Sequence, residues 1–178
     1  VASLFLPFLP LLAKQILLNN FLSDIPAMGI AGDNVDRSWD VTSHRWDIRL
    51  VRNFMITFGL ISSVFDLLTF GVLLHMAGEV AEVFRSGWFV ESLLTELLIL
   101  FVIRTHKPFY RSRPGMFLIW SSAVVIAITL MLPYLRIAAL FGFVPLPAPI
   151  MVAILVITVL YVVVSELTKR IFFRRFGM

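Results

Sequence analysis

The chain has 178 residues, 60% of them hydrophobic, and a mean hydropathy of +0.95. Soluble domains of this size are far less apolar, so the composition excludes a soluble globular protein and predicts an all-α, polytopic membrane helix bundle. The formal net charge of +4 and the pI near 10.0 do not require nucleic acid, because membrane proteins concentrate Lys and Arg on one side, and we expect no nucleic-acid partner.

Five segments are apolar and long enough to cross a bilayer core of ~30 Å, which takes about 17 to 25 helical residues. In chain order these predicted spans are 11–30, 54–76, 87–103, 116–135 and 150–167. Residues 1–6 are apolar but too short to span, and no basic segment precedes them, so they do not resemble a signal peptide. We interpret them as the end of a preceding helix and expect the sequence to be part of a longer protein.

The sequence contains no cysteine, which excludes disulfides, thiolate metal sites and cysteine nucleophiles. Its three histidines, His44, His75 and His106, fall near different membrane ends and are not expected to form a metal cluster. We find no phosphate-binding glycine loop and no Ser/His/Asp set on one side of the membrane. The chain therefore shows no catalytic constellation of its own.

The first span carries three polar residues near its middle. Asn20, Ser23 and Asp24 stand at i, i+3 and i+4, a spacing that places them on one helix face. An ionisable residue at the membrane centre costs about 2.5 to 3.5 kcal/mol on insertion scales and marks a candidate functional site. Carboxylate, amide and hydroxyl oxygens suit hard cations such as Mg²⁺. The alternative is that these residues are hydrogen-bonding contacts between helices.

A helix break is predicted directly after this polar trio. Pro26 removes a backbone N–H and clashes with the preceding turn, and Gly29 and Gly32 follow. Backbone carbonyls released inside a membrane must line a cavity or be buried in protein. We therefore expect Asp24 to lie at a bend that faces the third span, as in the discontinuous helices of several transporters.

The second and third spans contain further acidic residues. Asp66 either completes a cation site or pairs with a polar group such as Lys14. Glu96 lies near the centre of the third span and is the better ligand candidate. Glu91 is five residues away, about 140° around the helix, so we expect it on another face, toward the outer interface or an entry path. The fourth and fifth spans are predicted to be scaffold.

Twelve of the fifteen Lys and Arg residues fall in three segments, 31–53, 104–113 and 169–175. The positive-inside rule predicts that these segments are cytoplasmic and that 79–86 and 136–149 are external. Segment 31–53 balances four Asp with four Arg and includes two Trp, unlike a plain polybasic lipid anchor. It is either a solvated connector or a loop that docks onto a cytoplasmic protein domain.

Longer motifs add a family resemblance. PLLAKQILLNNFLSDIPAMGIAGDNVD resembles the sixth transmembrane helix of P-type cation-transporting ATPases, in which Asn, Ser or Thr, and Asp precede a helix break and an Asp-rich cytoplasmic loop. RWDIRLVRNFMITFGLISSVFDLLTFGVLL, SGWFVESLLTELLILFVIRT and KRIFFRRFG resemble the magnesium-transporting branch. The resemblance covers the whole chain, from the end of the fifth helix to the tenth.

This resemblance implies that residues 1–178 form one transmembrane domain of an ATP-driven pump in the plasma (inner) membrane, with a cytoplasmic C-terminus. It implies that Asn20, Ser23 and Asp24 are cation ligands and that Glu96 matches the acidic eighth-helix position of calcium-pump relatives. Mg²⁺ is then the transported ion and, in the complete pump, also accompanies ATP, and no cofactor is covalently bound. Asp66 remains a further candidate ligand.

The resemblance also sets the expected partners, which are the lipid bilayer, a divalent cation and the pump's own cytoplasmic phosphorylation domain, met by the loop after Gly32. The DKTG motif of the phosphorylated aspartate is absent from these residues. The chain alone is therefore not expected to hydrolyse ATP. The alternative function is an autonomous five-helix membrane carrier or an assembly protein.

Overall fold

The computed structural model describes residues 8–33, 48–78, 80–105 and 107–176. Within these ranges the chain forms helices and connecting turns, without a strand, so the predicted all-α class is confirmed. The α-helices are α1 (Ala13–Met28), α2 (Ile48–Ala77), α3 (Ala81–Ile103), α4 (Met116–Met131), α5 (Ala138–Phe141) and α6 (Ala148–Phe176). Short 3-10 helices are formed by Gly29–Gly32, Phe109–Arg111 and Leu132–Tyr134.

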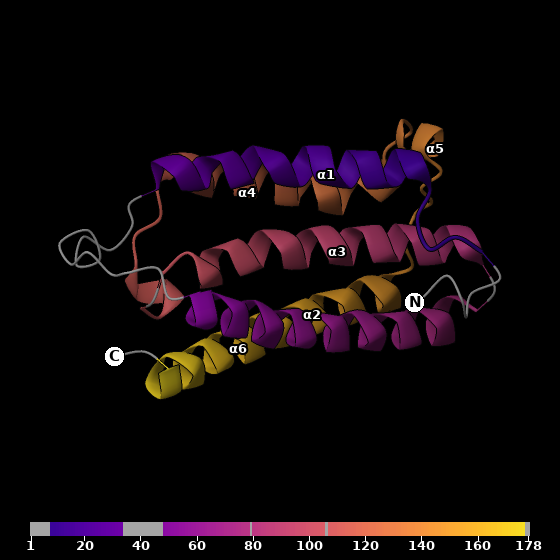
Figure 1. Cartoon of the computed structure of the whole chain (residues 1–178). Coiled ribbons are helices and arrows are strands. Elements are labelled where there is room, and N and C mark those ends of the chain that lie inside the picture. The colour runs from indigo at the N-terminus through magenta and orange to yellow at the C-terminus, as the bar shows by residue number, and fades with distance from the viewer. Residues whose placement is uncertain (1–7, 34–47, 79, 106, 177–178) are drawn as a thin grey trace.

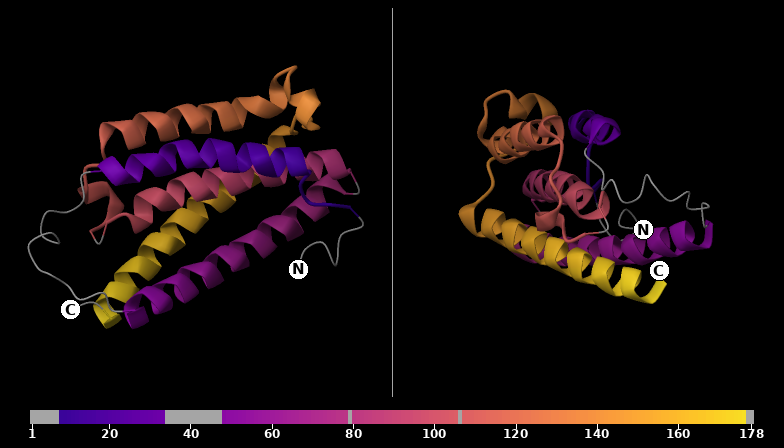
Figure 2. Two further views of the ribbon diagram at one scale, coloured as in Figure 1. Left: turned by 45° about the horizontal axis from the view of Figure 1, so that its top comes forward. Right: turned by 90° about the vertical axis from the view of Figure 1, so that its left-hand side faces the viewer.

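α3 is the central helix of the bundle. It packs against α1 and α4 on one side and against α2 and α6 on the other (Figure 1). The end-on view in Figure 2 shows the same order, with α3 between the two helix pairs. The ends of α1, α3 and α6 and the starts of α2 and α4 lie together at one end of the bundle, and α5 lies at the other.

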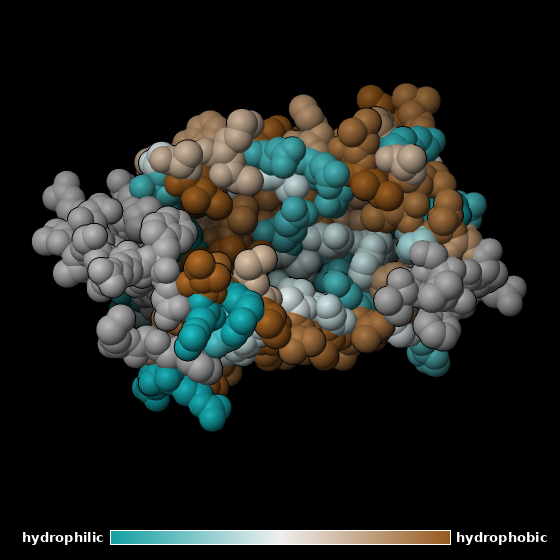
Figure 3. Space-filling model, in the orientation of Figure 1, coloured by the Kyte–Doolittle hydropathy of each residue, from teal (hydrophilic) through white to brown (hydrophobic). Residues whose placement is uncertain are grey.

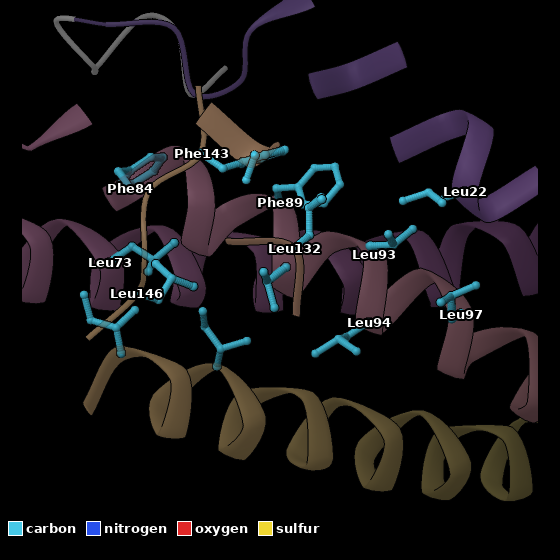
Figure 4. Packing of buried hydrophobic residues seen from close by; sticks show 14 of the residues in the cluster. Leu22, Leu73, Phe84, Phe89, Leu93, Leu94, Leu97, Leu132, Phe143 and Leu146 are labelled. Atoms are coloured by element: carbon cyan, nitrogen blue, oxygen red, sulfur yellow. The ribbon is translucent and has the colours of Figure 1, made fainter. Parts of the chain in front are cut away.

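The central place of α3 follows from its sequence, because a helix that is apolar around most of its circumference is buried. Phe84, Phe89, Leu93 and Leu97 of α3 are fully buried. Figure 4 shows these side chains directed toward the surrounding helices. This packing fixes the rotation of α3 and therefore the direction in which its two glutamates point.

Four helices are long and apolar enough to cross a membrane: Ile48–Ala77, Ala81–Ile103, Met116–Tyr134 and Ala148–Arg175. Large apolar side chains cover their outer surfaces, as expected of helices in contact with lipid. These four correspond to the second to fifth predicted spans, and the chain is an integral membrane protein. The count of five full spans is not confirmed, because α1 has 16 residues and ends in the 3-10 helix Gly29–Gly32.

Buried charge pairs tie the helices together at the end of the bundle that we call the basic end, formed by the ends of α1, α3 and α6 and the start of α4. Asp33 lies 2.5 Å from Arg104 Nη1, with both side chains buried, and also accepts the Gly115 N–H. Lys169 Nζ lies 2.8 Å from Glu166 Oε2 and donates to the carbonyl oxygens of Val102 and Lys107. Asp33 thus joins the segment after α1 to the end of α3 and the start of α4, and Lys169 joins α6 to the end of α3, by charge-assisted contacts.

Candidate cation site

α1 is an unbroken α-helix through Pro26, so the predicted break directly after Asp24 is wrong. Pro26 is buried in the last turn of α1, and the helix changes to a 3-10 helix at Gly29. A proline near a helix end removes one backbone hydrogen bond, which membrane helices tolerate when neighbouring helices support the segment. Asp24 therefore lies on a regular helix and not at a bend.

The polar trio of α1 is divided between two faces. Ser23 is buried against the bundle and donates to the carbonyl oxygen of Asn20 at 3.2 Å, whereas the Asn20 and Asp24 side chains are exposed. The buried polar face of α1 is formed instead by Gln15, Asn19 and Ser23. These residues repeat every four positions, which keeps them on one side of the helix.

Asn19, rather than Asn20, connects α1 to the acidic residue of α3. Its Nδ2 donates to Glu96 Oε2 at 3.1 Å, while its own Oδ1 is buried without a partner. The sequence analysis missed Asn19, although the spacing from Gln15 to Asn19 to Ser23 was a signal that could have found it. Glu96 is exposed in the described chain, so this hydrogen bond holds a carboxylate that remains accessible.

A cavity of about 280 Å³ lies between α2, α3 and α6, and we call it the acidic recess. Three carboxylates and four hydroxyl groups supply its polar lining. Figure 3 shows hydrophilic residues gathered over α1 and in the hollow between α1 and α2. The residues that line the recess are Ser62, Phe65, Asp66, Glu91, Ser92, Thr95, Glu96, Ile99 and Tyr161.

Glu91 and Glu96 both line the acidic recess, although they lie on different faces of α3, as the sequence analysis expected. The physical reason is the width of the recess. The residues of α3 at its wall occupy positions i, i+1, i+4, i+5 and i+8, an arc of about 140°. Glu91 and Glu96 lie at the two edges of this arc, and both edges border the cavity.

Asp66 of α2 lines the recess, a position that is compatible with the predicted role in a cation site. The alternative pairing with Lys14 is not observed, because Lys14 Nζ donates to the carbonyl oxygen of Leu140 at 2.5 Å. Tyr161 enters from α6, and its hydroxyl lies 2.9 Å from Ser62 Oγ. The fifth predicted span, interpreted as scaffold, therefore contributes a side chain to the recess. A single tyrosine in an apolar run did not indicate this role.

The described residues contain no group of three His, Asp or Glu side chains close enough to hold a metal ion directly. The recess instead offers carboxylate and hydroxyl oxygens around an open volume, which is the chemistry of a polar cavity for a hydrated or partly hydrated cation. Whether Asn20, Ser23, Asp24, Glu96 and Asp66 bind one ion together stays a prediction.

The sequence matches the family model described as "Cation transporting ATPase, C-terminus" over residues 8–171. The chain belongs to this family. The match confirms the resemblance to the C-terminal membrane domain of P-type cation-transporting ATPases.

Individual relatives of this cation-transporting ATPase domain have a more specific name. The Magnesium-transporting ATPase, P-type 1, of Salmonella typhimurium strain LT2 is 32% identical over 182 residues, which is 99% of this chain and 20% of the relative. The protein of the same name from Escherichia coli strain K12 is 36% identical over the same shares. The chain thus spans about a fifth of the length of the curated relatives it matches.

Proposed function

We propose that this chain is the cation-translocating membrane domain of an ATP-driven P-type pump that transports Mg²⁺. The observation that carries the proposal is the alignment of 99% of the chain with Magnesium-transporting ATPases. In this proposal the chain supplies the membrane path for the ion. ATP hydrolysis, with its own Mg²⁺, takes place in a phosphorylation domain elsewhere in the polypeptide.

The proposed ion ligands are Asn20, Ser23 and Asp24 of α1, with Glu96 and Asp66 from the neighbouring helices. Supporting this, the carboxylates of Asp24, Glu96 and Asp66 are exposed rather than packed into the apolar core. A carboxylate at membrane depth requires a polar cavity or a cation. The hydrogen bond from Asn19 to Glu96 links the face of α1 to the acidic recess.

Asp24→Asn in the complete pump tests the role of α1. We expect the variant to be expressed normally but to lose most cation-stimulated ATP hydrolysis and transport, because the substitution removes a formal charge at nearly constant volume. Glu82→Gln is the matched control, since Glu82 is an exposed carboxylate in the first turn of α3. Wild-type cation dependence of Asp24→Asn would leave Asp24 only a structural role.

The coding sequence provides a second test. A DKTG motif several hundred codons upstream of Val1, in the same polypeptide, is expected for a pump. A stop codon immediately before Val1 would instead favour an autonomous membrane carrier or assembly protein.

We further propose that the basic end faces the cytoplasm of a cell whose plasma (inner) membrane holds the pump. The support is that the starts and ends of helices that adjoin the three basic segments gather at one end of the bundle. Segment 31–53 would then contact the phosphorylation domain. Most of that segment, residues 34–47, lies outside the described residues.

Single introduced cysteines test this orientation. Tyr110 is 61% exposed near the basic end and Leu140 is 72% exposed near the other end. In a cysteine-free background, an impermeant thiol reagent added to intact cells is expected to label Leu140→Cys and not Tyr110→Cys. Labelling of Tyr110→Cys from outside would reverse the orientation.

A further inference from the structure

Glu91 is the most unusual charged residue of the bundle. Its side chain lines the acidic recess, the residue is only 1% exposed, and neither carboxylate oxygen has a hydrogen-bond partner. Thr69 of α2 faces this carboxylate, but its hydroxyl does not meet hydrogen-bond geometry either. A buried carboxylate without a partner is strongly unfavourable, so the position requires a positively charged or donating occupant.

Among the described residues that line the recess, none supplies a positive charge to Glu91. Asp66 of α2 and Glu96 of α3 border the same recess, and α6 contributes the hydroxyl of Tyr161. No Lys, Arg or His belongs to the lining. Three acidic side chains, surrounded by hydroxyl oxygens that can act as metal ligands, attract a cation from outside the chain.

The size and spacing of the recess decide how a cation would be held. The described residues include no three carboxylates close enough for direct coordination. The volume of about 280 Å³ exceeds the ~180 Å³ that six waters occupy at ~30 Å³ each. Mg²⁺ gives up its octahedral water shell reluctantly and often keeps several waters in proteins.

We propose that the acidic recess binds a hydrated divalent cation through water, with Glu91 as its buried anchor and Asp66 and Glu96 at its rim. The recess is lined by α2, α3 and α6 and by no α1 residue among those described. Its anchor, Glu91, is therefore set apart from the polar trio of α1, while Asp66 and Glu96 also belong to the proposed ligand set. Glu96 borders both regions through its contact with Asn19. The inference rests on the proposed cation transport, for which the recess would be a second ion position.

Cobalt(III) hexaammine is a suitable probe, since it has the size of hydrated Mg²⁺ but does not exchange its ligands and so binds only through its outer shell. The experiment measures its equilibrium binding, and competition by Mg²⁺, to the complete protein in detergent micelles. Wild type is expected to bind the complex competitively with Mg²⁺. Glu91→Gln is expected to bind it about tenfold more weakly or worse. Glu82→Gln is expected to bind it as wild type does, because Glu82 is an exposed carboxylate of the same helix that does not line the recess.

Three results would overturn the proposal: no binding to the wild type, unchanged binding to Glu91→Gln, or an equal loss of binding in Glu82→Gln. The second result is expected if a proton, and not a cation, occupies Glu91. Thermal unfolding gives an independent measure, because the probe should raise the Tm of wild type and not that of Glu91→Gln. The readout needs no ATP hydrolysis, so a protein without cation-stimulated ATPase activity would disprove the proposed function and still test this site.

Discussion

The basic end and the acidic recess both place charged side chains inside the same bundle, but they do so differently. At the basic end, Arg104 meets Asp33, and Lys169 meets Glu166 and two backbone carbonyl oxygens. In the recess, Glu91 has no partner and no basic side chain belongs to the lining. At the basic end each buried cation thus has a carboxylate partner, although Nε and Nη2 of Arg104 have no hydrogen-bond partner, whereas no basic side chain pairs with the carboxylates that line the recess.

This difference separates structural from functional charge. Removing one partner of a buried ion pair leaves the other charge unpaired and is strongly destabilising. An acid that is unpaired from the start already lowers stability, and replacing it by a neutral side chain should not destabilise the fold. Paired buried charges hold the helices together, whereas an unpaired buried acid is retained because of the ligand that it binds.

The largest expected effect is at Asp33. Asp33→Asn keeps an acceptor for the Gly115 N–H but leaves the buried Arg104 without its carboxylate, so we expect a loss of about 3 to 5 kcal/mol in the free energy of unfolding. The same substitution at Asp66, an exposed carboxylate of the recess, should change stability by less than ~0.5 kcal/mol. Denaturant titration of the purified complete protein measures both. Equal losses in the two variants would remove the distinction between the regions.

Lys169→Met should come next, with a loss of about 3 kcal/mol. The methionine fills a similar volume but cannot donate to Val102 and Lys107, while Arg170 still holds Glu166 Oε1 at 3.2 Å, which limits the damage. Lys14→Met is the matched control, because Lys14 is exposed and makes one contact to a backbone carbonyl. The comparison would be contradicted if Lys169→Met unfolds at the same denaturant concentration as this control.

Asn19→Leu tests the connection between α1 and the rim of the recess. Loss of its hydrogen bond to Glu96 should reduce stability by about 0.6 to 1.7 kcal/mol, the range measured for hydrogen bonds between membrane helices. Asn20→Leu is a close control for the stability measurement, since Asn20 is the exposed neighbour on the same helix. The cation dependence of ATP hydrolysis should shift in Asn19→Leu, because Glu96 is no longer held. An unchanged cation dependence would show that the contact only supports packing.

The smallest effect is expected for Tyr161→Phe. This change removes one hydroxyl, with its 2.9 Å contact to Ser62 Oγ, from the wall of the recess. A single hydrogen bond of this kind contributes about 1 kcal/mol or less. Stability should therefore change little, while binding of cobalt(III) hexaammine should weaken by a few-fold. Destabilisation as large as that of Lys169→Met would mean that the recess, like the basic end, is chiefly structural.

Much of this molecule was predictable from residue type and spacing. The apolar runs located all four long membrane helices, although α2 and α3 each begin six residues before their predicted spans and α6 ends nine residues after its predicted span. The polar residues inside the runs identified Asp66 and Glu96, which do line a cavity. These features follow from local rules. A helix must be apolar along its whole length to cross the bilayer, and a carboxylate within such a helix is rare because its burial in lipid is costly.

Only the tertiary structure decided which of these polar residues meet. Helical periodicity places Asn19 on one face with Gln15 and Ser23, and Asn20 about 100° away, but it does not decide which of the two faces turns toward α3. Contacts of α1 with α3 and α4 set the rotation of α1. Packing of α3 against four neighbours brings Glu91, Asp66 and, from a distant part of the sequence, Tyr161 to one recess. Neighbouring helices likewise accommodate Pro26 without the break that local rules predicted. The sequence by itself thus determined the helices and their polar residues, whereas the rotations and the shared recess depended on contacts between segments far apart in the chain.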